Sequence, residues 1–216
     1  MKSSKEIREY FLDLLNSALP RLSMYGEEVV LQYFLSHLAF VDERDTELKA
    51  HMETLCTRGA FTSLGVGGAF NQYTHLPAQS NEIGSVYAEI AFKMGYLNTD
   101  RILDKNEFAT LRSGLRSTCR SRNFNTEDVV KEFGVPSWRS GTNPFYPWTY
   151  LYLCNDIDVG MIAFDFWNVV YYDEKAEKTC GTFGDLPVLR NIRIRGDNFS
   201  REFTFTPIGR KITKRD

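Results

Sequence analysis

The sequence has no apolar run that approaches the roughly 18 residues of a membrane span. Its first residues, Met1–Lys5, lead into an amphipathic pattern and not into the apolar core of a secretory signal. We therefore expect a folded protein of the cytoplasm that has no membrane partner.

Cysteine and histidine are scarce and widely spaced. The cysteines show no CxxC spacing, so we predict that all of them are reduced thiols and that no structural zinc is bound. Nothing in the sequence matches a phosphate loop, a GxGxxG loop or a GxSxG elbow, and we expect no cofactor. The cysteines are Cys56, Cys119, Cys154 and Cys180, and the histidines are His37, His51 and His75.

The composition is that of an ordinary globular protein, with 43% hydrophobic and 25% charged residues among 216. Charge is divided unevenly, because residues 1–100 hold 8 Lys/Arg against 13 Asp/Glu, whereas residues 101–216 hold 18 against 15. Either the back half meets something acidic, or the two halves attract one another.

Helical periodicity dominates the first part of the chain. It predicts helices over residues 5–19, 26–40, 45–59, 81–97 and 105–119, and a short one over 127–133. On the second of these, His37 is interpreted as a core histidine. Between Ala60 and Ser80 the periodicity is lost, and Gly65–Gly68 indicates a long irregular connection of the kind that often carries function.

Strand signals dominate the second part. Aromatic residues crowd positions 145–172, and Ile162, Phe164 and Phe166 alternate with Ala163 and Asp165. We predict four or five antiparallel strands and an α+β fold, in which an N-terminal helical bundle packs on a C-terminal antiparallel sheet. Residues 1–122 form the helical region, residues 123–216 form the short helix and the sheet, and the two share one core.

One local resemblance involves the run Thr126–Pro136, TEDVVKEFGVP, and the aromatic strands after it. Residues 124–172 resemble the helix-then-meander unit of BamE-like bacterial modules, over less than a quarter of the chain. The resemblance implies a local helix followed by two strands, and it implies no function.

Arginines form the clearest candidate binding surface. Arg112, Arg116 and Arg120 are four residues apart, so a continuous helix would place them on one ridge, which Arg122 extends. Arg193 and Arg195 add basic positions on a predicted strand. Such a ridge binds phosphate or carboxylate groups equally well, and it is also a common form of solvated surface or of internal ion pairing.

An acidic pattern supports one enzymatic alternative. Asp158 and Asp165 precede a hydrophobic strand that ends in Asp173 and Lys175, which fits the arrangement of metal-dependent nucleases. The same residues also fit a polar hairpin turn.

Two functions follow from these patterns. The better supported is a non-enzymatic module that binds a protein partner, such as a bacterial immunity protein that neutralises a toxin, or another inhibitory protein. It needs no catalytic residues, and it accounts for the uneven charge and the many Arg and Tyr residues. The alternative is a nucleic-acid-binding protein or a nuclease that uses the basic ridge and the Asp/Lys strand.

Overall fold

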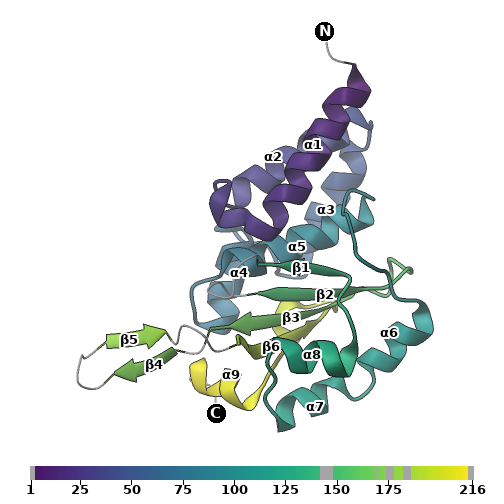
Figure 1. Ribbon diagram of the computed structural model, residues 1–216. Coiled ribbons are helices and arrows are strands. Elements are labelled where there is room, and N and C mark those ends of the chain that lie inside the picture. The colour runs from purple at the N-terminus through teal and green to yellow at the C-terminus, as the bar shows by residue number, and fades with distance from the viewer. Residues whose placement is uncertain (1–2, 142–147, 169, 174–177, 182–185, 214–216) are drawn as a thin grey trace. The chain divides into compact units, whose positions relative to one another are not determined.

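The computed structural model describes residues 3–141, 148–168, 170–173, 178–181 and 186–213, and for 170–173 and 178–181 only the backbone. Contacts divide the chain into two compact units. Unit 1 is Met1–Thr99 with Gly196–Arg201, and unit 2 is Asp100–Arg195 with Glu202–Asp216. Within the described ranges most helices precede a five-stranded antiparallel sheet, which confirms the α+β class (Figure 1). The predicted boundary at residue 122 and the shared core stay predictions.

Unit 1 is helical. A capping box starts its first helix, because the Ser3 hydroxyl accepts the N–H of Glu6 and the Glu6 carboxylate accepts the N–H of Ser3. Pro20 lies in the short 3-10 segment that follows, as expected for a residue that ends an α-helix. The elements are α1 (Ser4–Ala18), η1 (Leu19–Met24), α2 (Glu28–Val41), α3 (Asp45–Thr57), α4 (Gly65–Thr74), α5 (Ser80–Lys93) and η2 (Phe199–Arg201).

Helices α1 and α2 pack side by side in opposite directions. Arg8, near the start of α1, donates from Nε to both carboxylate oxygens of Asp42, just after α2, at 2.8 and 3.0 Å. Leu15 of α1 and the α2 residues Leu31, Leu35 and Leu38 are buried. One side of each helix therefore faces the core of unit 1.

Helix α4 corrects the prediction that residues 60–80 form an irregular connection. The Glu28 carboxylate accepts the N–H of Val66 at 2.8 Å and that of Gly67 at 3.3 Å, so an anion caps the positive end of α4. Tyr87 donates its hydroxyl to the same carboxylate at 2.7 Å. Gly65 has φ +72°, and a Cβ there would lie 2.5 Å from a Glu28 oxygen, so glycine permits this contact.

Unit 2 is built around the sheet, whose strand order is β1-β2-β3-β6-β7 with antiparallel neighbours throughout. Strands β4 and β5 pair separately as a hairpin. Its elements are α6 (Lys105–Arg112), α7 (Leu115–Ser121), α8 (Thr126–Phe133), β1 (Trp138–Ser140), β2 (Thr149–Leu153), β3 (Met161–Trp167), β4 (Val170–Asp173), β5 (Lys178–Gly181), β6 (Val188–Ile194), β7 (Phe203–Phe205) and α9 (Pro207–Ile212).

The two faces of the sheet differ in chemistry. Ile162, Phe164 and Phe166 of β3 join the apolar core formed with α6, α7 and α8, and Figure 1 shows α8 lying across this face. Met161, Ala163 and Asp165 belong to the other face, and they are buried as well. The predicted alternation along β3 is therefore present, but the polar residue that it contains is not exposed.

Replacing Glu28 with alanine should destabilise the protein by about 2–3 kcal/mol, because two N–H groups of α4 and the Tyr87 hydroxyl lose a charged acceptor. Chemical denaturation measures the change. Glu53→Ala is the matched control. Glu53 is exposed, and its one ion pair, with Lys49, is long at 4.0 Å and therefore weak. Equal unfolding midpoints for the two variants would contradict this account of α4.

Candidate functional site

Exposed apolar side chains follow one side of α1 and α2. Phe40 is 73% exposed and Tyr33 53%, although both are large side chains that folding normally covers. Val29, Tyr33 and Phe40 are four and seven residues apart, so they share one face of α2. Exposed apolar groups that gather in this way usually mark an interaction site. We name this surface the α1–α2 strip: Ile7, Tyr10, Val29, Tyr33 and Phe40.

Aromatic contacts organise the middle of the strip. The ring of Phe11 stacks on His37 at 4.7 Å between centroids and meets Tyr33 edge-on at 6.1 Å. His37 also lies 4.0 Å from the Tyr33 ring, and its Nδ1 is 2.8 Å from the Tyr33 carbonyl oxygen. His37 was predicted to be a core residue, and instead it is half-buried beneath the strip. These contacts hold the exposed rings in a preformed arrangement.

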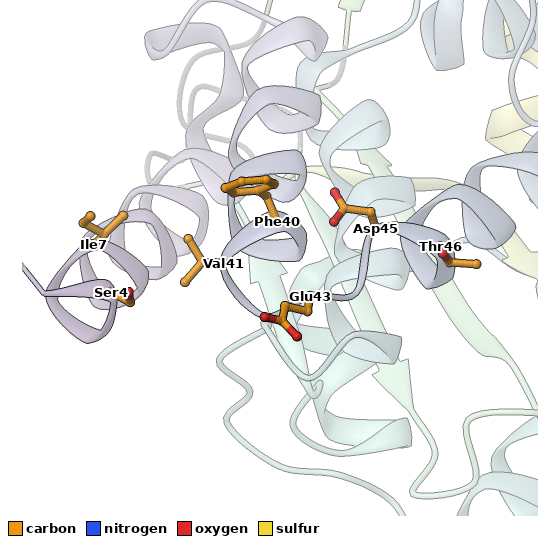
Figure 2. A pocket seen from close by; sticks show the side chains of 7 residues that line it. All are labelled: Ser4, Ile7, Phe40, Val41, Glu43, Asp45 and Thr46. Carbon is orange, nitrogen blue, oxygen red and sulfur yellow. The ribbon is translucent and has the colours of Figure 1, made fainter.

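A hollow of about 490 Å³ lies at one end of the strip. Ser4 and Ile7 line it from α1, and Phe40 and Val41 from the end of α2 (Figure 2). Glu43, Asp45 and Thr46, on the connection to α3 and its first turn, complete the lining. The hollow is therefore apolar on one side and acidic on the other.

The charge around the strip is negative. Arg8 is already engaged with Asp42, whose hydrogen bond raises the pKa of the Arg8 guanidinium. Lys5 lies 3.9 Å from Glu9, which offsets one acid. The acidic residues that stay exposed on α1 and at the hollow are Glu6, Glu9, Asp13, Glu43 and Asp45.

The predicted arginine ridge is present in an altered form. The single helix expected over Lys105–Cys119 is wrong: extended Ser113 and left-handed Gly114, at φ +71°, separate α6 from α7. Burial lowers the pKa of Arg116, and so do the nearby charges of Arg120 and Arg112. The three cations therefore still lie close together, with Arg112 on α6 and the other two on α7.

The remaining predicted binding residues have other surroundings. Arg122 is exposed, is paired with Glu132 at 2.5 Å and lies over the Phe124 ring. Arg193 was predicted to belong to a binding surface, and that is wrong, because its side chain is 1% exposed and paired with Asp165. Arg195 is half-buried. The basic strand thus belongs largely to the interior.

Asp165 is the centre of this buried polar cluster. Arg193 donates to both of its oxygens, from Nε at 2.7 Å and from Nη2 at 3.1 Å. Asn191 donates to one oxygen at 2.7 Å and Thr149 to the other at 3.1 Å. Burial alone would raise the pKa of Asp165, but the charge and hydrogen bonds of Arg193, with help from Arg190 and Asn191, lower it. The four donors leave this carboxylate no position for a metal.

Only two of the four residues of the nuclease alternative have described side chains, and those two lie apart. Asp158 is exposed between β2 and β3, whereas Asp165 is the fifth residue of β3, at least about 13 Å further along an extended strand. The side chains of Asp173 and Lys175 lie outside the described residues. Among those that are described, no three Asp, Glu, His or Cys residues gather as metal ligands do.

The cysteines agree with the prediction as far as they are described. Cys56, Cys119 and Cys154 are free thiols, and the side chain of Cys180 lies outside the described residues. Burial raises the pKa of Cys119 to about 12, so this thiol is inert at neutral pH. In the described ranges no helix has the length and apolarity that a bilayer span requires.

No protein-family model, curated protein or solved structure matches this chain. The resemblance predicted for residues 124–172 stays a prediction. The function of the protein therefore has to follow from the chemistry of its own surfaces.

The buried pair gives a double-mutant prediction. Asp165→Asn should lower the free energy of unfolding by about 3–5 kcal/mol, because the charge of Arg193 stays buried without its partner. The apolar double change Asp165→Leu with Arg193→Met should cost much less, since it removes both charges. Denaturant titrations of the two variants and the parent measure this difference.

The dependence of stability on pH in acid tests the same ion pair between Asp165 and Arg193. Since the pKa of folded Asp165 is lowered, its contribution is fully present above the ordinary aspartate pKa of about 3.9 and is lost as the pH falls through the folded value. The parent protein should therefore lose more stability below about pH 4 than the apolar double variant does. Parallel curves for the two proteins would rule out this contribution.

Proposed function

We propose that this protein is a non-enzymatic binding module whose α1–α2 strip docks a basic protein partner. The observation that carries the proposal is the strip itself: large apolar side chains are exposed on two adjacent helices, and the rings of Tyr10 and Tyr33 both pack on Phe11. Tyrosine and phenylalanine are enriched at the centres of protein interfaces, where they bury much area for little loss of side-chain entropy.

The hollow gives the partner a place to anchor. A lysine or arginine side chain fits its chemistry, because the methylene groups would lie on Ile7 and Phe40 while the charged end meets Glu43 and Asp45. Side chains buried in such pockets usually supply most of the binding energy. The acidic groups along α1 add attraction over a longer range and favour a basic partner over an acidic one.

A module of this kind acts by occupying its partner, so it needs no catalytic group. This fits an inhibitory or toxin-neutralising protein of a bacterial cytoplasm, and the basic charge expected of the partner is common among proteins that act on nucleic acids. The described residues support this proposal better than the nuclease, because Asp165 is fully engaged by its four donors.

Changing Val29, Tyr33 and Phe40 together to serine should abolish binding of the partner, with a loss of at least about 100-fold in affinity. The protein should stay folded with a modest loss of stability, because Val29 and Phe40 are mostly exposed and only Tyr33 gives up ring contacts, with Phe11 and His37. Affinity capture from the source cells identifies the partner, and calorimetric titration with the purified partner measures the loss.

The matched control changes three exposed apolar residues of unit 2 to serine: Val135, Ile157 and Leu186. This variant should bind the partner as the parent does. Equal losses in both variants, a captured partner of acidic charge, or self-association of the parent through the strip would each contradict the proposal.

The acidic groups should act mainly on the rate of association. Glu9→Gln, Asp13→Asn and Glu43→Gln together should slow binding of the same partner several-fold and weaken its dependence on salt, while dissociation changes little. Surface plasmon resonance at several salt concentrations separates the two rates. A change confined to dissociation would mean that these carboxylates make close contacts and do not steer the partner.

A further inference from the structure

Unit 2 carries a second surface, of the opposite charge. Residues 108–126 contain four arginines and no acidic residue, and residues 203–213 contain Arg210 and Lys211 and again no acid. The structure brings these two segments together: Arg210 Nη2 donates to the carbonyl oxygen of Arg120 at 3.3 Å, and the N–H of Ile208 donates to Asn123 at 2.8 Å. We name this the α7–α9 basic surface: Arg112, Arg116, Arg120, Arg210 and Lys211.

Close packing holds α9 in this position. The Thr206 hydroxyl caps the helix by accepting the N–H of Gly209 at 3.1 Å. A Cβ on Gly209 would lie 1.8 Å from the carbonyl oxygen of Arg190, so only glycine allows α9 to approach β6 this closely. Arg116 is tied to β7 in turn, because it donates to the Thr204 hydroxyl at 2.6 Å. The basic surface is therefore a fixed feature of unit 2.

Four of the five cations on this surface have no acidic partner among the described residues, and the fifth, Arg116, lies near Glu202. Within the described residues, Arg112, Arg120, Arg210 and Lys211 form no ion pair, whereas the neighbouring Arg122 is paired with Glu132. Burial is the main reason that the pKa of Arg116 is lowered; the charges of Arg120 and Arg112 lower it further, and Glu202 opposes the shift. A fold that keeps like charges together in this way is matched to an external anion.

We propose that the α7–α9 basic surface binds the phosphate backbone of nucleic acid. The exposed side chains between the arginines are small: Ser113, Ser117 and Ser121 leave room for a phosphate group, although the last two already donate their hydroxyls to the carbonyl oxygens of Gly114 and Thr118. Arginine and serine are typical donors to phosphate oxygens. A bidentate guanidinium also matches phosphate geometry better than a lysine would.

The absence of apolar groups decides against an acidic protein as the ligand. Residues 103–134, all of them described, expose no large hydrophobic side chain, and neither do residues 199–213. A stable protein interface needs an apolar centre, as the α1–α2 strip provides, whereas nucleic-acid interfaces are polar and basic. Backbone contacts of this kind carry no base specificity, so binding should be similar across sequences.

Fluorescence anisotropy with a short labelled DNA duplex of mixed sequence tests the proposal on the full chain. Arg112→Gln, Arg120→Gln and Lys211→Gln together should reduce affinity at low salt by about tenfold or more, and should reduce the slope of log affinity on log salt by up to about three units. Arg116 and Arg210 are left unchanged because they also make internal hydrogen bonds.

The matched control removes the same charge from other exposed positions of unit 2, through Lys105→Gln, Lys131→Gln and Arg139→Gln. It should keep the parent's salt slope, and so should the serine variant of the α1–α2 strip, which separates this proposal from the proposed function. Thermal unfolding followed by circular dichroism confirms that each variant is folded. Absence of duplex binding by the parent, equal losses in the control, or binding of poly-glutamate in place of the duplex would overturn the proposal.

Discussion

The ion pair between Asp165 and Arg193 is the interaction on which the sheet of unit 2 depends. A buried carboxylate is tolerated only when its oxygens are fully hydrogen-bonded, and here the donors come from the two strands that flank β3, Thr149 from β2 and Asn191 and Arg193 from β6. A one-residue slip of β6 would move Arg193 to the opposite face and bring Ile192 or Ile194 beside the aspartate. The pair thus specifies the register of β3 against β6, and it explains why an arginine-rich strand is not a binding surface.

Periodicity was sufficient to predict the helices that bury one side, and it failed where backbone conformation depends on distant groups. Helix α4 begins with glycines, which disfavour helix, and it exists because Glu28, far away in the sequence, caps it. The break between α6 and α7 has the opposite origin, since a left-handed Gly114 ends a helix that the apolar spacing would have continued. A hydrophobic pattern does not show that a carboxylate distant in the sequence caps a helix, nor that one residue adopts a left-handed φ angle.

The sequence was also insufficient to predict which side chains of the candidate surfaces are exposed. Helix α2 is apolar on nearly all sides, so its sequence does not show that Phe34 is covered whereas Tyr33 and Phe40 are exposed. The same holds for arginines, whose exposure cannot be predicted from residue type alone. Arg112 is exposed, whereas Arg193 is buried and paired with Asp165, and the tertiary structure decides which is which. The spacing of Arg112, Arg116 and Arg120 did predict that these three residues lie close together, but not that the helix breaks between the first and the second.

The two proposed surfaces select ligands by different physics. The α1–α2 strip combines apolar area with negative charge, a combination that suits the basic protein proposed for it and disfavours nucleic acid. The α7–α9 basic surface has charge and hydroxyl groups without apolar area, so it attracts phosphate and offers a protein nothing to bury. Salt acts on the two unequally: it releases a nucleic acid held by counterion exchange, while burial of apolar area at the strip is scarcely screened. Raising the salt concentration should therefore separate the two proposed kinds of binding, because it weakens the phosphate contacts far more than the apolar ones.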